Sequence, residues 1–325
     1  MKKLAYILFI TLFATNSFAQ NYSNYKPDDH APIGVMRDHI HKKGEIMASY
    51  RYSLMQMKGL RNNSDNVSTN EALNDYNYMM APADMQMHMH MLGFMYGITD
   101  NLTTSIMGSL VEKDMNIVRK SNGQEIKREA NGFGDTKINA LYQFYNKNNK
   151  EAILAFGISL PTGEIDEAYD GTRLAYSMQI GSGSYELLPS ITFKSFKESY
   201  SIGFQTNGVF RLDTNDHGYK LGDRYNFTSW ISKNLNNNIS ISSRLNFEIF
   251  EAIEGNDSSL NKMMTPANDT SLYDGKRLDL SFGINYLFNN GHRLALELAS
   301  PIYQRLDGPQ METRYQLTVG WQKSF

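Results

Sequence analysis

The residues best suited to chemistry lie in the stretch MQMHMHMLGFMYGI at positions 85–98. Methionine recurs at every second position from Met85 to Met91, with His88 and His90 between them. Thioether sulfur and imidazole are ligands that copper(I) and related soft ions prefer. A spacing of two is also the repeat of a β-strand, in which alternate side chains share one face. The stretch is therefore either a metal-binding stripe or one face of a strand, and the surrounding elements must decide.

A second group of candidate ligands precedes the first expected strand. The segment DHAPIGVMRDHIHKKGE, residues 29–45, contains His30, His39 and His41. His39 and His41 are two apart, so on an extended chain both point the same way. The segment also contains Asp29 and Asp38, and with a nearby Asp the two histidines could bind a transition metal if the segment folds back into the barrel. The alternative is that these histidines hydrogen-bond a plug to the barrel wall. A copper ion is the only cofactor suggested, and the main hypothesis below needs none.

The first residues predict export from the cytoplasm. Lys2 and Lys3 precede an apolar run at 4–13, and small residues follow, as in a secretory signal peptide over residues 1–19. The chain has no cysteine and cannot rely on disulfides. Removing the two lysines changes the formal charge from −2 to −4, too slight a bias to predict nucleic acid as a partner.

Alternation of apolar and polar residues recurs along the rest of the chain. In LDLSFGINYLF, residues 278–288, every second side chain is apolar and Asp, Ser, Gly and Asn lie between. The stretches 239–249 and 200–212 repeat this pattern, with Arg244 and Arg211 in mid-strand on the polar face. A sandwich core would not accommodate charges there, whereas a water-filled lumen does. We therefore predict an all-β, antiparallel transmembrane barrel over residues 44–325.

About twelve strands are expected, joined alternately by short polar turns and longer loops, as in outer-membrane barrels. The strands are predicted at 44–57, 84–98, 101–112, 132–145, 150–160, 184–196, 199–212, 220–232, 238–250, 275–288, 292–303 and 312–325. The longer connections are predicted at 58–83, 113–131, 161–183, 213–219, 251–274 and 304–311. Residues 20–43 are expected to be a periplasmic segment or a plug in the lumen.

The carboxy-terminal stretch TRYQLTVGWQKSF alternates in the same way and ends on Phe325. It resembles the assembly signal of bacterial outer-membrane proteins, although Lys323 stands where that signal usually has an apolar residue. The resemblance implies the outer membrane of a Gram-negative bacterium as the location. It also implies outer-membrane lipid and the barrel assembly machinery as partners.

Four further stretches resemble an outer-membrane family named for meta-pathway phenol degradation, whose members are commonly called transporters. They are HAPIGVM at 30–36, GFGDTKINALYQF at 132–144, SLPTG at 159–163 and LDGPQ at 306–310. The resemblance covers most of the mature chain. It implies a barrel and a transport role, and it leaves the solute open.

Alternation also predicts which side chains line the lumen. Arg51 fixes the inner face of the first strand, and Leu92 and Phe94 fix the outer face of the second. His88 and His90 then share the lipid-facing side and must lie at or above the outer interface, unless a bulge near Gly93 exchanges the faces. The predicted pathway residues are Arg51, Met55, Met57, Met87, Met89, Met91, Asp135, Lys137, Asn139, Arg211, Arg244 and Glu248.

The main functional hypothesis is an outer-membrane channel or facilitator for small solutes, including hydrophobic or aromatic ones, and not an enzyme. A methionine face suits this role as a pliant apolar surface. The alternative is a barrel that handles copper or another soft metal through its Met and His groups. A third hypothesis, an outer-membrane lipid hydrolase, needs an outward serine beside His88 or His90, but alternation turns Ser105 and Ser109 inward.

Overall fold

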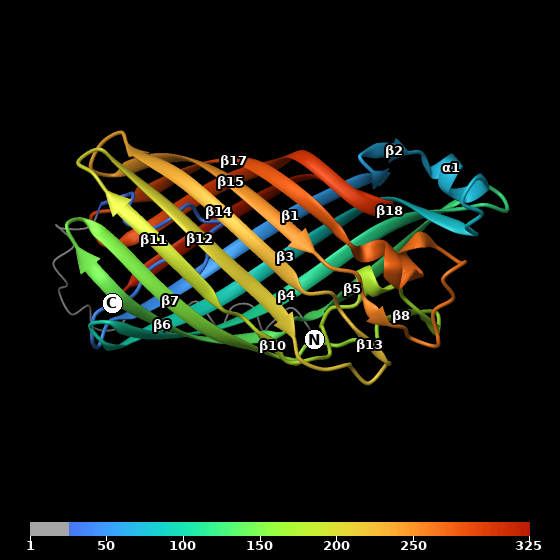
Figure 1. Ribbon diagram of the computed structural model, residues 1–325, viewed down its shortest axis with the longest axis horizontal. Coiled ribbons are helices and arrows are strands. Elements are labelled where there is room, and N and C mark those ends of the chain that lie inside the picture. The colour runs from blue at the N-terminus through green and yellow to red at the C-terminus, as the bar shows by residue number, and fades with distance from the viewer. Residues whose placement is uncertain (1–25) are drawn as a thin grey trace, which may run out of the picture.

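The structure is a computed structural model that describes residues 26–325, so the predicted signal peptide lies outside the described residues. The chain forms a closed antiparallel β-barrel (Figure 1). The strands of its wall are β1 (Ile46–Asn63), β3 (Met80–Thr99), β4 (Leu102–Arg119), β5 (Glu125–Phe133), β6 (Thr136–Lys147), β7 (Lys150–Leu160), β10 (Glu186–Leu187), β11 (Ser190–Phe196), β12 (Tyr200–Arg211), β14 (Arg224–Asn234), β15 (Ile239–Phe250), β17 (Gly275–Leu287) and β18 (His292–Ser324).

The hydrogen-bonded ladder closes on itself. β12 pairs with β10 and β11 on one side and with β14 on the other, and β1 pairs with both β3 and β18. β18 folds back: residues 292–306 pair with β17 and residues 306–324 pair with β1. β5 and β6 succeed each other along β4, and β10 and β11 do so along β7. The described chain thus runs from one end of the barrel to the other twelve times. The predicted antiparallel barrel is confirmed.

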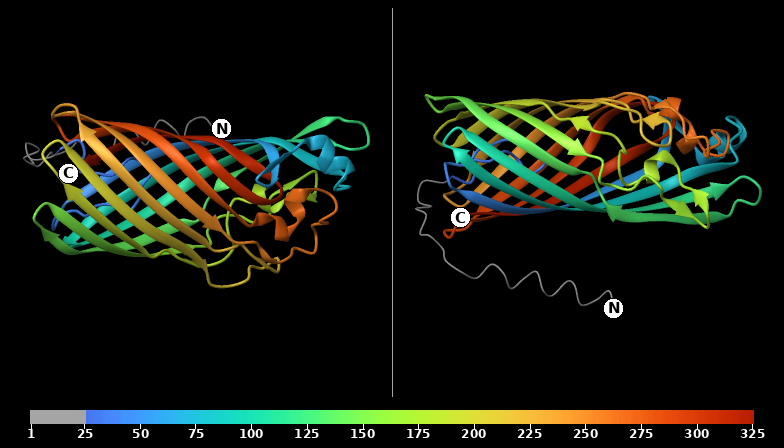
Figure 2. Two further views of the ribbon diagram at one scale, coloured as in Figure 1. Left: turned by 45° about the horizontal axis from the view of Figure 1, so that its top comes forward. Right: turned by 90° about the horizontal axis from the view of Figure 1, so that it is seen from below.

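The two ends of the barrel differ in construction (Figures 1 and 2). Short turns and the C-terminus lie at one end, which we call the turn end. The other, the loop end, carries the longer connections and most of the short elements. These elements are β2 (Asp65–Val67), α1 (Thr69–Asn74), β8 (Ala168–Tyr169), β9 (Thr172–Arg173), η2 (Tyr176–Met178), β13 (Tyr219–Lys220), β16 (Glu254–Gly255), η3 (Pro266–Asn268) and η4 (Thr270–Tyr273).

Apolar side chains form an exposed belt around the outside of the barrel. They come from alternate positions of nearly every strand, and include Leu92, Phe94, Ile106, Tyr142, Phe156, Phe204, Ile231, Leu245, Phe282, Ile284, Leu296 and Leu298. The intervening side chains point inward, and many are polar and buried, such as Gln205, Ser242 and Asn285. This is the polarity of a barrel that lies in lipid and has a polar interior. Among residues 26–325, no helix is both long and apolar enough to cross a membrane.

The polarity of the wall reverses toward the loop end. On β4 the inward Val111, Met115 and Ile117 are buried, while Glu112 and Asp114 face outward. The outward Lys127 of β5 pairs with Asp114 at 3.0 Å. Above the belt the wall therefore has a charged outer surface and an apolar interior, like a protein in water.

The strands near the loop end are longer than the alternation predicted. β4 and β5 extend through most of the predicted loop 113–131, β1 and β3 extend into the two ends of the predicted loop 58–83, and β18 continues through 304–311. In these extensions charged side chains face outward and apolar side chains face inward, the reverse of the belt. A prediction that looks for outward-facing apolar residues therefore ends each strand at the edge of the belt. Conversely, the predicted strands 132–145 and 184–196 are each interrupted, which gives β5 with β6 and β10 with β11.

Replacing a belt residue by arginine should destabilise the barrel according to its depth. Leu296 lies on the outward face of β18, opposite Ile284 of β17. We expect Leu296→Arg to lower the free energy of unfolding in lipid by about 2–4 kcal/mol, the usual cost near the bilayer midplane. Gln86→Arg, outward but above the belt, is the control and should change it by roughly 1 kcal/mol or less. Denaturant titration in vesicles measures both, and equal effects would contradict the assigned belt.

Candidate functional site

Residues 26–44, which we call the inserted segment, precede β1 and contact the inner face of the barrel from its turn end. Its beginning is held by side chains of three strands. Arg293 of β18 donates to the carbonyl oxygen of Pro27 at 2.8 Å, and Ser240 of β15 donates to the same oxygen at 3.0 Å. Ser201 of β12 donates to the carbonyl oxygen of Asp28 at 3.2 Å. These donors are inward-facing and buried, so the segment enters the lumen.

The segment then forms a loop inside the barrel and returns to β1. Gln205 of β12 donates to the carbonyl oxygen of Met36 at 2.8 Å, and the guanidinium of Arg37 donates to that of Leu188. Burial lowers the pKa of Arg37 to about 10, which leaves it charged at neutral pH. The returning limb is fixed by Thr103 of β4, which accepts from His41 N at 2.8 Å.

Packing of the inserted segment requires small residues at two places. Ile33 lies against Gly320 of β18, where an added Cβ would be 2.6 Å from the Ile33 Cδ1 atom. Gly34 lies over an ion pair, and a Cβ there would be 2.2 Å from a carboxylate oxygen of Glu297. Ala31 and Val35 pack on Trp230 of β14. The segment is thus fitted to this wall by shape.

The ion pair beneath Gly34 joins Arg244 of β15 to Glu297 of β18. Arg244 Nη2 lies 2.6 Å from Glu297 Oε1, and Arg244 Nε lies 3.2 Å from Glu297 Oε2. Both side chains are buried. A buried pair of this kind is costly to break from one side, because the remaining charge is left without a partner. The predicted pathway residue Arg244 is therefore part of the seat of the inserted segment.

The methionines of β1, β3 and β4 line one side of the lumen. We call this face the methionine wall; its members are Met47, Met55, Met57, Met85, Met87, Met89, Met91, Met95, Met107 and Met115. The register places Met57, Met85 and Met115 in one row across the three strands. Met55 lies opposite Met87, and Met47 opposite Met95.

The methionine wall has two parts. Toward the loop end, Met85 and Met115 are buried in an apolar cluster with Leu174 and Met178 of a loop. Below them, Met87, Met89 and Met91 keep part of their surface exposed on the lumen face. The upper methionines thus pack a loop to the wall. The lower three present thioether surface to the interior.

The histidines between these methionines face away from the lumen. β1 and β3 pair without a bulge from Ile46 to Lys58, so no exchange of faces occurs at Gly93. His90 Nδ1 lies 2.8 Å from the hydroxyl of Tyr50, and His88 Nδ1 lies 2.8 Å from that of Tyr52. Both pairs lie at the loop-end edge of the belt, where aromatic side chains with polar tips commonly occur. The Met and His groups therefore do not form one metal site.

Most of the other predicted pathway residues lie inside the barrel in ion pairs or hydrogen bonds. Arg211 pairs with Glu186 at 2.9 Å, and Glu248 pairs with Arg277 at 2.9 Å. Asn139 donates to Ser105 Oγ at 3.2 Å.

Asp135 and Lys137 both lie next to the loop at 161–183. The carboxylate of Asp135 accepts from Gly163 N, Ser182 N and Ser182 Oγ. Asp135 therefore holds this loop in place. Lys137 lies on the same inward face of β6 as Asn139, opposite Ser159 of β7.

The loop end of the lumen is covered by segments 161–183, 213–223 and 251–274. Lys113 of β4 donates to the carbonyl oxygens of Ser177 and Gln179 at 2.9 and 2.6 Å. Tyr176, Tyr219 and Ile253 from the three segments form a buried cluster of their own. We call this layer the loop cap.

One cluster in the inserted segment has the composition of a metal site. One nitrogen each of His30 and His39 and one oxygen of Asp38 all lie within 4.8 Å of one another. Burial lowers the pKa of His30 well below its ordinary value and also lowers that of His39, so both rings are neutral at neutral pH. His41, also predicted as a ligand, lies beside the cluster: its ring is edge-on to that of His39 with centroids 5.2 Å apart, and its Nδ1 lies 3.4 Å from the carboxylate of Glu45.

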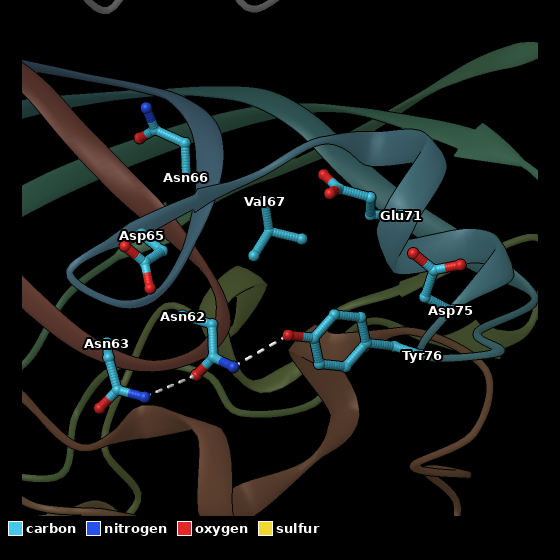
Figure 3. Close-up of a pocket in the computed structure, with 8 residues that line it drawn as sticks. All are labelled: Asn62, Asn63, Asp65, Asn66, Val67, Glu71, Asp75 and Tyr76. Carbon is cyan, nitrogen blue, oxygen red and sulfur yellow. Dashed lines mark hydrogen bonds between the residues drawn. The ribbon is translucent and has the colours of Figure 1, made fainter.

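An open pocket lies at the loop end, beside β2 and α1 (Figures 1 and 3). It has a volume of about 450 Å³. Its lining comes from the end of β1, β2 and α1 and consists of Asn62, Asn63, Asp65, Asn66, Val67, Glu71, Asp75 and Tyr76. Tyr76 accepts a hydrogen bond from Asn62 at 2.9 Å.

Three important residues were not singled out from the sequence: Glu297, Trp230 and Lys113. Glu297 stands in LALELA, residues 294–299, as a charge among small inward residues, which is the signal that identified Arg244. Trp230 is inward by the alternation of β14, but its contact with the inserted segment has no local signal. Lys113 lies in a region that was expected to be a loop.

Comparison with known proteins agrees with the barrel. The fold is similar to that of an outer membrane channel from Pseudomonas putida F1, with a TM-score of 0.62 at 13% sequence identity over 88% of this chain and 97% of that one. The Pseudomonas putida toluene transporter TodX matches with a TM-score of 0.45 at 9% identity, over 88% of this chain and 91% of that one. The KdgM porin matches with a TM-score of 0.43 at 11% identity, over 86% and 99%. No curated protein matches the chain by sequence.

A sequence family gives the more specific assignment. The family described as "Putative MetA-pathway of phenol degradation" matches residues 66–300, more than half of the chain. The matched range includes two of the four stretches that carried the resemblance, 132–144 and 159–163, so the family resemblance is confirmed and the chain belongs to this family.

Proposed function

We propose that the protein is a channel of the Gram-negative outer membrane that admits small apolar solutes, aromatic ones in particular. The observation that carries this proposal is the lower methionine wall, a partly exposed thioether surface inside a closed barrel. Methionine is flexible and polarisable and makes favourable contacts with aromatic rings. The phenol-degradation description of the family supports the same class of solute. Such a channel carries out no chemical reaction, since a concentration gradient supplies the work.

The proposed orientation places the turn end in the periplasm and the loop end outside the cell. Short turns on the periplasmic side and long connections on the outer side are the rule for such barrels. The loop cap is then the outer entrance and the inserted segment the inner obstruction. Solute would pass the methionine wall between them after a rearrangement of either.

The inserted segment should limit flux. Gly34→Leu places a side chain where a Cβ already meets Glu297 and Arg244, so we expect the segment to leave its seat while the barrel stays folded. Conductance in planar bilayers should rise several-fold over the wild type. Gly108→Leu is the matched control because an added Cβ there meets nothing within 4 Å, and its conductance should stay unchanged.

Deletion of residues 26–43 provides a second variant for the same prediction. The deletion should raise conductance at least as much as Gly34→Leu does, because it removes the inserted segment and leaves the wall residues beneath it unchanged. If the deletion protein is folded, as judged by heat-modifiable migration in gels, and conducts like the wild type, the segment is not the limiting obstruction.

The lower methionine wall should select apolar solutes. Replacing Met87, Met89 and Met91 together by glutamine keeps their length and adds an amide, so burying an aromatic ring against them becomes unfavourable. We expect uptake of a monoaromatic compound into liposomes to fall about tenfold, the effect of roughly 1.4 kcal/mol. Uptake of a small sugar should change less than the aromatic uptake does.

Two controls belong to this experiment. The triple leucine variant retains an apolar wall and should keep most of the aromatic uptake. Met263→Gln alters an exposed loop methionine and should have no effect. Equal losses for sugar and aromatic solute in the glutamine variant would argue against an apolar pathway along this face.

A further inference from the structure

The cluster of His30, Asp38 and His39 joins the two limbs of the inserted segment. His30 lies on the entering limb, and Asp38 and His39 lie on the returning limb. The His30 and His39 rings have centroids 3.8 Å apart and planes inclined by 32°. Asp38 further connects the limbs, since its Oδ2 accepts from Ala31 N at 2.8 Å.

The two histidines have nitrogen atoms that nothing in the described chain uses. His39 Nδ1 lies 2.9 Å from Asp38 Oδ1, while His39 Nε2 is buried without a hydrogen-bond partner among residues 26–325. His30 Nδ1 is likewise buried without such a partner within that range. Two buried imidazole nitrogens left unpaired are a cost to the fold. A bound cation would satisfy the lone pair of His30 Nδ1.

The distances suit one small ion. Ligands at 2.0–2.2 Å around tetrahedral zinc lie roughly 3.4 Å apart. The three ligand atoms, within 4.8 Å of one another, therefore need to close by at most about 1.4 Å. Asp38 Oδ2 can keep its contact with Ala31 N while Asp38 Oδ1 and His39 Nδ1, now 2.9 Å apart, both bind the ion in place of their contact with each other.

The charges around the cluster are nearly balanced. The cations that act on it are Arg51, Lys194 and Arg293, and Asp28 and Asp29 lie close to Arg293. Asp38 adds a third carboxylate. At the turn end a small pocket is lined by His30, Met47 and Arg293.

We propose that His30, Asp38 and His39 bind one divalent late-transition-metal ion, with zinc as the representative, and that this ion crosslinks the two limbs of the inserted segment. Two imidazoles and one carboxylate are a donor set that zinc accepts, with a further position for water. Binding itself does not depend on the proposed channel function. Only the effect of the ion on flux rests on it.

The test is zinc titration of the full, untagged, folded barrel in detergent by calorimetry. We expect saturable binding of one ion per chain. The variants His30→Ala, His39→Gln and Asp38→Asn should each weaken zinc binding at least about 100-fold. Loss of a residue that only supports a ligand costs at most about that much, so loss of a ligand should cost more. His88→Ala with His90→Ala is the matched control, since these rings face outward in Tyr pairs, and it should bind like the wild type.

A second readout reports on the crosslink. At a zinc concentration about 100 times the Kd, the fraction of molecules in which the segment is open should fall about 100-fold. The rate of trypsin cleavage after Arg37 and Lys42 should fall by the same factor. His39→Gln with the same zinc controls for inhibition of the protease. Heat-modifiable gel migration identifies any variant that fails to fold.

Cobalt(II) bound to the wild type gives a test that needs no variant. Two paramagnetically shifted sets of imidazole ring signals are expected in its NMR spectrum. Absence of stoichiometric binding, persistence of binding in His30→Ala and His39→Gln, or cobalt signals without imidazole would each overturn the site. A silent channel that still binds zinc would count against the channel proposal alone.

Discussion

The continuous ladder of backbone hydrogen bonds around the barrel is the interaction on which the other features depend. Lipid offers no partner for an unpaired amide or carbonyl, so a strand wall in a membrane must close on itself. Here closure is achieved by β1, which pairs with the end of the chain in β18, and by the pairing of β12 with β14. Once the ladder is closed, each strand has one face outside and one inside. Whether lipid, water or protein lies against a face at a given depth then determines which side chains are tolerated on that face.

Segments outside the wall strands contact the inner face of this barrel at both ends. The inserted segment occupies the turn end and is seated on Trp230, Gly320 and the Arg244–Glu297 pair. The loop cap packs on Met85 and Met115 at the other end. Between them lies the part of the methionine wall that stays partly exposed. The charged residues on the inner face mostly form ion pairs with one another, so their main role is to make a polar interior without leaving charges unpaired.

Within the belt the sequence was sufficient to predict the wall. The alternation of Leu278 to Phe288 and of Ile239 to Ile249 fixed both the strands and their inner faces, because lipid on one side and polar groups on the other impose opposite requirements. The faces of Met87, Met89 and Met91 stayed open in the sequence, because a bulge near Gly93 would have exchanged them, and the unbroken pairing of β1 with β3 decides them.

Prediction failed where those requirements change or where contacts are distant in the chain. Above the belt, Glu112 and Asp114 of β4 face water. The strand continues there, although its charged residues are on the outer face and its apolar residues on the inner face. The meeting of His30 with His39 depends on a loop that the barrel wall supports, and His41 lies edge-on to the His39 ring while also contacting Glu45. The seat beneath Gly34 combines β15 with β18, more than fifty residues apart in the chain. No local pattern encodes such a contact.

The inserted segment is joined to the wall at a hinge. Gly44 N donates to the carbonyl oxygen of Gly97 at 2.8 Å, and Gly44 has a φ of 87°, in the left-handed region that suits glycine. A segment released from its seat remains covalently tethered at this point, within a few nanometres of it. A short tether of this kind keeps the effective concentration near the millimolar range. Reseating is therefore a first-order event whose rate does not depend on how many copies the membrane holds, and the obstruction cannot be lost by dilution.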